Sequence, residues 1–319
     1  MDAIQVTNIT KTFSDLVAVD NVSFTVRPGE VFGYLGPNGA GKTTTIRILT
    51  GITTPTLGTA RIFDLDIVSD TIRARQQMGI VYETSNVYDD LTAWQNMMVA
   101  GELYNVGKKD REERGSALLA TFGLLERKGS RVHGFSKGMK RRLTLAMGLI
   151  NDPKLLFLDE PTSGLDVQSN LIIREVLQDL TSRGVTVFLT THNIEEANIT
   201  CDRVAIINKG RIAAIDSPER LKKTIQSVQS IEVAFEKGIN EALTSLARLH
   251  MVSEVRKEGD KIRLYTDDPT TLLEEIMEYS RVHQNRVVSA TTRGPTLEDV
   301  FIHLTGLQAP STGGGGNGR

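Results

Sequence analysis

Short apolar runs separated by turn residues recur along the first two thirds of the chain, and they predict strands. Ile4, Val6 and Ile9, and then the stretch 17–26, alternate in part between apolar and polar side chains, as half-buried strands do. Strands buried on both faces of a sheet are favoured by three runs that are apolar almost throughout, at 31–35, 155–158 and 185–190. Further strands are expected at 60–63, 79–82, 204–207 and 211–215, of which the last two form a hairpin.

Apolar residues between about 91 and 150 follow a helical spacing instead. One amphipathic helix is predicted from Trp94, Met97, Met98 and Leu103, and a second from Ala117, Leu118, Phe122 and Leu125. We expect these helices to form a subdomain, about 89–150, inserted into an α/β core. Other helices are expected at 43–49 and 167–181, with one more beginning at Pro218.

The pattern changes after residue 223 to the order β-α-β-β-α-β, which fits a ferredoxin-like split βαβ unit. Strands are expected at 231–235, 252–255, 262–265 and 287–288, and helices at 239–249, 269–279 and 297–304. The predicted organisation is a first domain 1–222, a linker 223–229, an accessory α+β domain 230–306 and a flexible glycine-rich tail 307–319. No catalytic cluster stands out in the accessory domain.

Composition narrows the class of protein. The chain has 319 residues, enough for two domains, and its 37 basic and 39 acidic residues give no large field of one sign. A nucleic-acid partner is therefore not expected. The single cysteine, Cys201, excludes an intrachain disulfide and is compatible with a reducing compartment. Neither a signal-peptide pattern nor an apolar run approaching the ~20 residues of a membrane span is present, so we expect a soluble chain that reaches a membrane only through a partner.

A glycine-rich segment joins the strand at 31–35 to the helix at 43–49. It reads Gly36, Pro37, Asn38, Gly39, Ala40, Gly41, Lys42, Thr43, Thr44, a G-x-x-x-x-G-K-T sequence. Glycines let backbone N–H groups turn inward toward phosphate, and the helix N-terminus adds partial positive charge there. Lys42 can reach the β- and γ-phosphates, and the Thr43 hydroxyl can bind Mg²⁺. The strand and helix on either side favour a phosphate site over a simple turn.

Two carboxylates, Asp159 and Glu160, end the apolar run at 155–158. Ligands of open α/β sheets bind at this edge, and a buried acidic pair is costly unless something uses its charge. Asp159 can hold Mg²⁺, and Glu160 can polarise a water for attack on the γ-phosphate. His192 ends another strand at the same edge, and at this position a structural and a functional role for the histidine are about equally well supported.

Two weaker signals accompany these motifs. Phe13 lies in a polar stretch upstream of the phosphate loop, where stacking on adenine is at least as good an explanation as a place in the core. Ser136 is a candidate N-cap at the start of a helix, and such a helix end can receive an anion, although most such sites are only caps.

Together these motifs resemble the nucleotide-binding subunit of ATP-binding cassette (ABC) transporters over about residues 1–222, with a P-loop NTPase fold. By this resemblance 36–44 is the Walker A loop, and 135–139 is the signature motif that offers Ser136 and Gly138 to phosphate. The run 155–160 is Walker B with the catalytic glutamate, and 163–166 is the D-loop. His192 is the switch histidine, and Phe13 is the aromatic that stacks on adenine.

The chain departs from the family pattern at two places. Glu83 stands where the family usually has Gln; its carboxylate can still bind Mg²⁺ but adds a negative charge beside the phosphates. The signature reads FSKGM rather than LSGGQ, yet it keeps Ser136 and Gly138, whose hydroxyl and backbone N–H the phosphate contact needs.

The resemblance implies an ATPase that uses ATP and Mg²⁺. Two copies face head to tail, and Ser136 and Gly138 of one copy close over the ATP held by Phe13, Lys42 and Thr43 of the other. It also implies a separate multispanning permease, reached through the helical subdomain, and a location in the cytoplasm on the inner face of the cell membrane. The accessory domain resembles those of drug- or polysaccharide-exporter cassettes.

Two other functions explain the sequence less completely. A soluble ABC-type ATPase of translation usually carries two cassettes, and one of DNA repair carries long heptad arms, neither of which is evident here. A small-molecule kinase would leave the FSKGM segment and His192 unexplained.

Overall fold

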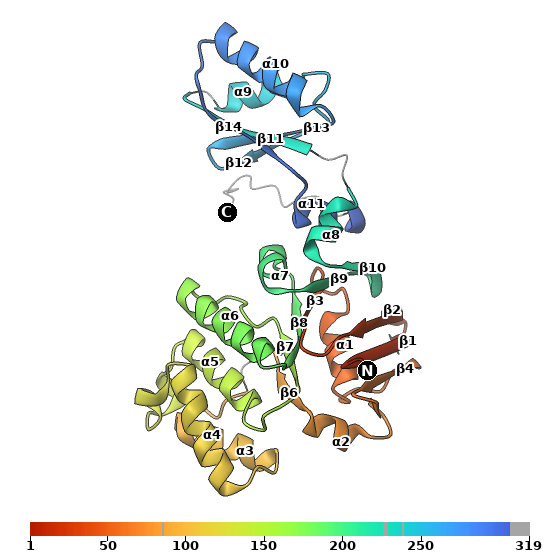
Figure 1. Cartoon of the computed structure of the whole chain (residues 1–319), viewed down its shortest axis with the longest axis vertical. Coiled ribbons are helices and arrows are strands. Elements are labelled where there is room, and N and C mark those ends of the chain that lie inside the picture. Colours follow the sequence, from red (N-terminus) through yellow and green to blue (C-terminus); the bar gives the residue numbers. More distant parts are fainter. Residues whose placement is uncertain (85, 226–228, 238, 307–319) are drawn as a thin grey trace, which may run out of the picture. The chain divides into compact units, whose positions relative to one another are not determined.

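The computed structural model describes residues 1–84, 86–225, 229–237 and 239–306. The chain divides into two compact units, Met1–Pro218 and Glu219–Arg319 (Figure 1). The sequence places the boundary at residue 222, and its division into a first domain, a linker and an accessory domain stays a prediction. Part of the predicted linker, 226–228, and the whole predicted tail, 307–319, lie outside the described residues. Each unit is described by itself.

The first unit is built around a six-stranded sheet in the order β10-β9-β3-β8-β7-β6. Five of these strands pair in parallel, and β10 pairs antiparallel with β9. Every residue of β3 and β7 is buried, as their continuous apolar sequences predict. The strands are β3 (Val31–Leu35), β6 (Met78–Val81), β7 (Leu155–Asp159), β8 (Thr186–Thr191), β9 (Arg203–Asn208) and β10 (Arg211–Asp216).

A second, antiparallel sheet in the order β2-β1-β4-β5 completes the core of this unit. Phe24 of this sheet stacks on Phe32 of β3, with ring centroids 5.4 Å apart, and Phe32 stacks on Phe188 of β8. These aromatic contacts fasten the two sheets to each other. The strands are β1 (Ile4–Phe13), β2 (Leu16–Val26), β4 (Leu57–Ile62) and β5 (Leu65–Asp66), and the helix that follows β3 is α1 (Lys42–Leu49).

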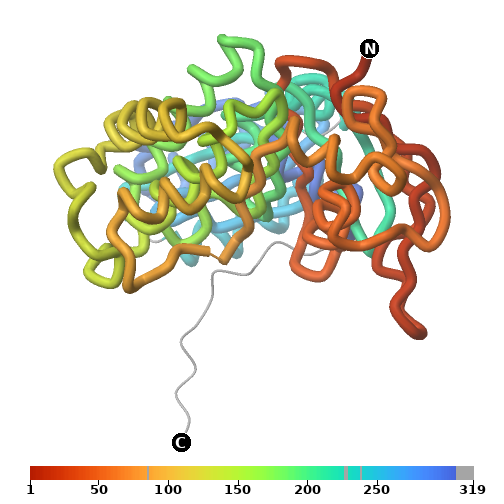
Figure 2. Tube along the Cα trace, turned by 90° about the horizontal axis from the view of Figure 1, so that it is seen from below, coloured from red at the N-terminus to blue at the C-terminus, as the bar shows by residue number. Residues whose placement is uncertain are grey.

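Helices α3 (Ala93–Leu103), α4 (Lys108–Thr121) and α5 (Lys137–Gly148) stand between β6 and β7 in the sequence. In both views they lie on the opposite side of the parallel strands from the antiparallel sheet (Figures 1 and 2). The second predicted helix is wrong at its end, because Gly123 adopts φ 65° and Leu125 begins a short 3₁₀ helix instead. The remaining helices of the unit are α2 (Thr71–Gln76), α6 (Val167–Ser182) and α7 (Ile194–Thr200).

The second unit carries a four-stranded antiparallel sheet in the order β12-β13-β11-β14. Ile231, Val233, Ile262 and Leu264 project from one face of it and pack against α9 and α10. The ferredoxin-like assignment of this unit stays a prediction. Its elements are α8 (Pro218–Lys223), which crosses the division, β11 (Gln229–Phe235), α9 (Ile239–Leu246), β12 (Glu254–Glu258), β13 (Lys261–Thr266), α10 (Pro269–Val282), β14 (Val287–Arg293) and α11 (Leu297–Thr305).

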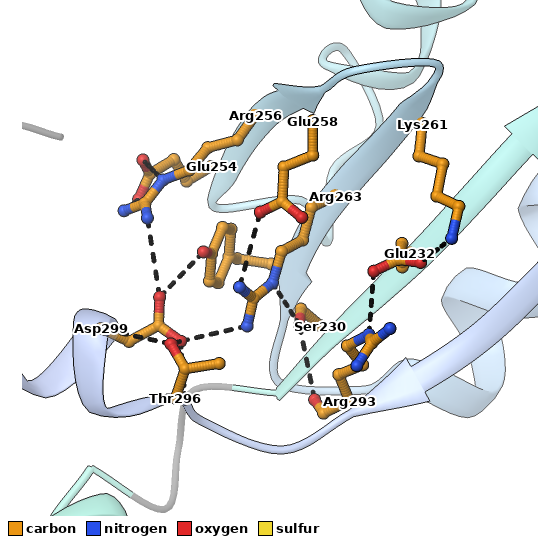
Figure 3. A network of polar contacts seen from close by, with 11 residues as sticks. Ser230, Glu232, Glu254, Arg256, Glu258, Lys261, Arg263, Arg293, Thr296 and Asp299 are labelled. Carbon is orange, nitrogen blue, oxygen red and sulfur yellow. Dashed lines mark hydrogen bonds and ion pairs between the residues drawn. The ribbon is translucent and has the colours of Figure 1, made fainter. Parts of the chain in front are cut away.

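Charged side chains occupy the other face of this sheet and anchor α11 to it (Figure 3). Asp299 of α11 accepts hydrogen bonds from Arg263 Nη2 at 3.1 Å and from Tyr265 Oη at 2.8 Å. Arg256 Nη1 lies 3.6 Å from the same carboxylate. Thr296, the N-cap of α11, donates to Asp299 through both its backbone N–H and its hydroxyl. Asp299 and Arg263 are both buried and form an ion pair at 3.1 Å, and Arg263 Nη1 also lies 3.5 Å from Glu258 Oε1.

The ionisation of Asp299 therefore links the stability of this unit to pH. Burial raises the pKa of Asp299, but the hydrogen bonds from Thr296 and Tyr265 and the charge of Arg263 together lower it below its usual value. A carboxyl with a depressed folded pKa stabilises the fold above its unfolded pKa of roughly 3.9. That contribution is lost as the pH falls through the lower, folded pKa.

We expect Asp299→Asn to destabilise the second unit by about 3 kcal/mol at pH 7, because it removes the buried carboxylate beside Arg263 and leaves that guanidinium the exposed Glu258, 3.5 Å away. Hydrogen exchange of the β13 and α11 amides measures the loss, and the decline in protection below about pH 4 should be smaller in the variant than in the wild type. Glu298→Gln, at an exposed position on the same turn, is the control. Unchanged protection in Asp299→Asn would contradict the anchoring role.

Candidate functional site

The register of three parallel strands brings the predicted motifs to one edge of the sheet. Leu35, the last residue of β3, lies opposite Thr191 of β8, and Thr190 lies opposite Asp159, the last residue of β7. The residues that follow these strands, which include Glu160 and the phosphate loop, therefore leave the sheet side by side. This is the carboxyl edge, where ligands of open α/β sheets bind.

The phosphate loop closes tightly before α1. Gly41 has φ 103°, and a Cβ there would lie 2.4 Å from the carbonyl oxygen of Ala18, so that only glycine fits. A Cβ at Gly36 would lie 2.5 Å from the carbonyl oxygen of Ile207. No side chain caps the N-terminus of α1.

A cavity of about 620 Å³ opens beside this loop, a size typical of sites for small ligands. The structure brings most of the predicted residues to it, and it adds others from β2 and the β9–β10 hairpin that the sequence did not suggest. Its lining includes Phe13, Asn38, Gly39, Gly41, Lys42, Thr43, Thr44, Glu83, Glu160, Ser163, His192, Lys209 and Gly210.

Lys42 and Glu160 form an ion pair inside this cavity. Lys42 is 6% exposed, and its Nζ donates to the carbonyl oxygens of Gly36 at 2.8 Å and Pro37 at 3.2 Å. The same Nζ lies 3.2 Å from Glu160 Oε1, while Glu160 Oε2 lies 2.8 Å from His192 Nδ1. Glu160 also adopts φ 47°, which is uncommon for a residue with a side chain. The carboxylate is therefore held from two sides on a constrained backbone.

The oxygen atoms expected to bind Mg²⁺ lie next to one another. Thr43 Oγ1 is 3.4 Å from Asp159 Oδ1, and Thr190 Oγ1 donates to the same carboxylate oxygen. Asp159 is buried, and Glu83 lines the cavity nearby. Within the described ranges no group of three or more His, Cys, Asp or Glu side chains could hold a metal. A hydroxyl and a carboxylate nevertheless fit Mg²⁺, which takes few protein oxygens and completes its shell with water and phosphate.

Ser136 and Gly138 are not brought to this cavity. Ser136 is the N-cap of α5 and accepts a hydrogen bond from the backbone N–H of Met139 at 3.2 Å. Gly138 packs so closely against α6 that a Cβ would lie 2.4 Å from Ser169 Oγ and 3.2 Å from Asp166 Oδ2. The site therefore lacks, within one chain, two of the residues that the sequence assigned to it.

Two buried polar residues near the site were missed by the sequence reasoning. Arg141 lies within a basic run that looks like a solvated helix face, yet its spacing from the buried Gly138 and Leu145 could have placed it on the inner face. Glu196 of α7 accepts a hydrogen bond from Thr162 Oγ1 at 2.6 Å, and burial raises the pKa of its carboxyl. No sequence signal separates Glu196 from its exposed neighbour Glu195.

Comparisons with known proteins agree with this geometry. Residues 19–163 match the family described as ABC transporter. The Nod factor export ATP-binding protein I of Cupriavidus metallidurans is 38% identical over 307 residues, 96% of this chain and 98% of that protein. The protein of the same name from Rhizobium meliloti is 39% identical over 308 residues, 96% of this chain and 89% of that protein. The chain belongs to the ABC transporter family.

Solved structures of ABC proteins share its fold. An ATP-binding subunit of an ABC transporter is 28% identical with a TM-score of 0.65, and the match covers 70% of this chain and 92% of that one. A dimeric ATP-binding cassette in a post-hydrolysis state, bound to ADP and phosphate, is 25% identical with a TM-score of 0.62, covering 67% and 98%. The predicted P-loop ABC fold is thus confirmed, and this ABC subunit binds ATP and is an ATPase. In the described part of the chain, no helix has the length and apolarity that crossing a bilayer requires.

The aromatic ring of Phe13 offers a direct test of the nucleotide position. The side chain is 46% exposed at the cavity, and Lys11 Nζ lies 5.0 Å from its ring centroid. If the ring stacks on adenine, Phe13→Ala should weaken ATP binding by about 1–3 kcal/mol. Titration calorimetry measures this, with Leu57→Ala, an exposed apolar position outside the cavity lining, as the control. An unchanged dissociation constant would remove Phe13 from the site.

Proposed function

We propose that this chain is the ATP-hydrolysing subunit of an ABC exporter, in which two copies clasp MgATP head to tail and drive a separate membrane permease. The observation that carries the proposal is the divided site. Lys42, Thr43 and Glu160 line one cavity, whereas Ser136 and Gly138 of the same chain lie outside it. A second copy turned head to tail supplies the missing pair.

Ser136 and Lys137 at the start of α5 are exposed, which suits this contact. The hydroxyl of Ser136 and the first N–H groups of the helix can donate hydrogen bonds to a γ-phosphate. The dimeric solved cassettes support an assembly of two copies. In such a dimer each nucleotide lies between the phosphate loop of one chain and the α5 start of the other. ATP then favours the closed pair, because it contacts both chains only in that state.

The ion pair between Lys42 and Glu160 suggests how ATP prepares the site for hydrolysis. Lys42 exchanges the carboxylate for the γ-phosphate, which carries more negative charge. Glu160 is then free to accept a proton from the attacking water, and His192 keeps the other carboxylate oxygen in place. Thr43, Asp159 and Glu83 would hold Mg²⁺, which neutralises charge on the β- and γ-phosphate oxygens.

A groove of about 310 Å³ between β6 and the helices is our candidate for the permease contact. It is lined mainly by apolar and aromatic side chains, and Tyr88 and Leu103 are exposed at it. Tyr82 lines this groove and directly precedes Glu83, so that a segment docked here would press on a residue of the nucleotide cavity. The chain would then lie in the cytoplasm on the inner face of the membrane.

Export is favoured over the alternative of a soluble ATPase in translation or repair. The relatives that match this chain over nearly its whole length are named as export proteins. The three helices between β6 and β7 have 11, 14 and 12 residues, too short for the long heptad arms of repair proteins.

The experiment that tests the proposal is Glu160→Gln. The variant keeps the shape of the side chain but loses the base, so it should bind ATP, form a dimer with MgATP, and lose ~10²–10⁴ in turnover. Light scattering with and without MgATP measures the dimer, and phosphate release measures turnover. Glu195→Gln, at an exposed position on α7, is the matched control. Undiminished turnover, or a strictly monomeric variant at saturating MgATP, would overturn the proposal.

A further inference from the structure

Arg141 of α5 is a buried cation whose hydrogen bonds all go to main-chain oxygens around the nucleotide cavity. The residue is only 4% exposed. Its Nε donates to the carbonyl oxygen of Pro161 at 2.9 Å, and its Nη2 donates to those of Asp159 at 2.8 Å and Glu160 at 3.0 Å. Its Nη1 donates to the carbonyl oxygens of Tyr82 and Glu83. Five N–H donors of one guanidinium thus meet five carbonyls.

These carbonyls belong to two separate loops. One runs from Asp159 to Pro161 and contains the catalytic carboxylate, and the other begins after β6 with Tyr82 and Glu83. Burial lowers the pKa of Arg141, and the nearby Asp159 and Glu83 carboxylates oppose that shift. A buried charge is tolerated only when fully paired, so both loops must keep the arrangement that satisfies it. No other residue type presents five donors in one rigid plane.

The fixed geometry matters most at Glu160. Its backbone at φ 47° is a strained conformation for a residue with a side chain, and it persists only where the surroundings impose it. Arg141 holds the carbonyl of Glu160 itself and those of the residues on both sides of it. The direction of the Glu160 side chain toward Lys42 and His192 follows from this backbone.

We propose that Arg141 is a positioning residue for hydrolysis that couples the start of α5 to the catalytic carboxylate of its own chain. The inference rests on the proposed function, in which Ser136 and Gly138 of the same helix contact the partner's ATP. Arg141 lies five positions after Ser136 on this rigid helix. A shift of α5 on closure is therefore passed to Glu160 and Glu83 together, so that hydrolysis at one site responds to ATP at the other.

Arg141→Gln tests the proposal. Because a misplacement of about 1 Å can cost 10²-fold, we expect kcat to fall about 10²-fold while KM and the dissociation constant for ATP stay near the wild-type values. The matched control is Arg142→Gln, since the neighbouring Arg142 donates to a single carbonyl, that of Phe122, away from the cavity. Wild-type kcat in Arg141→Gln would overturn the inference.

A second comparison separates positioning from a purely structural role. If Arg141 acts through Glu160, the double variant Arg141→Gln/Glu160→Gln should have the same residual turnover as Glu160→Gln alone. If the two residues act independently, the fold-losses of the two single variants should multiply in the double variant. Multiplying effects, or a parallel loss of kcat, ATP affinity and Tm, would overturn the proposal. Arg141→Lys keeps the buried charge but has three donors at one point, so it is measured alongside in case Arg141→Gln does not fold, and it should show the same loss of kcat.

The two hypotheses fail in different ways. If Glu160→Gln stays monomeric with MgATP, the proposed function fails regardless of Arg141. If Glu160→Gln forms its dimer but Arg141→Gln hydrolyses ATP like the wild type, only the positioning role of Arg141 fails.

Discussion

The parallel pairing of β3, β8 and β7 is the constraint on which the site depends. Each strand contributes its last residue at nearly the same level, and the phosphate loop, His192 and Glu160 follow directly. A shift of one residue in β7 would turn Asp159 to the opposite face and separate it from Thr43. The aromatic contacts behind the strands, from Phe24 to Phe188, hold this register from the core side.

A second constraint is electrostatic. Lys42 is buried and requires an opposite charge, which Glu160 supplies at 3.2 Å. In the proposed function Glu160 accepts a proton from water, and its carboxylate is paired with Lys42 until a phosphate takes its place. When Lys42 turns to the phosphate, the backbone around Glu160 must be held by something other than the nucleotide. Arg141 meets that requirement from within the same chain.

Much of this was predictable because the decisive elements are local. The buried strands are continuous apolar runs, and the phosphate loop, Asp159 and Glu160 follow them directly, so motif and context agree. The helix predicted to include Leu125 ends before it, since one glycine outweighs the apolar spacing. The role of Arg141 was not predictable, because a basic run normally faces solvent. Its five hydrogen-bond partners lie on two loops that come together only in the folded chain. The network around Asp299 likewise depends on contacts between residues far apart in the sequence.

In the proposed dimer, each ATP lies between the phosphate loop of one chain and the α5 start of the other. The most direct test mixes two singly defective chains in a Glu160→Gln background, one with Lys42→Ala and one with Ser136→Glu, which sets a negative charge against the partner's phosphate. A homodimer of either variant has a defect in both of its sites. A head-to-tail heterodimer has both defects in one site and leaves the other site intact. We expect occluded MgATP only in the mixture. A mixture that occludes none, although the chains associate, would contradict the shared site.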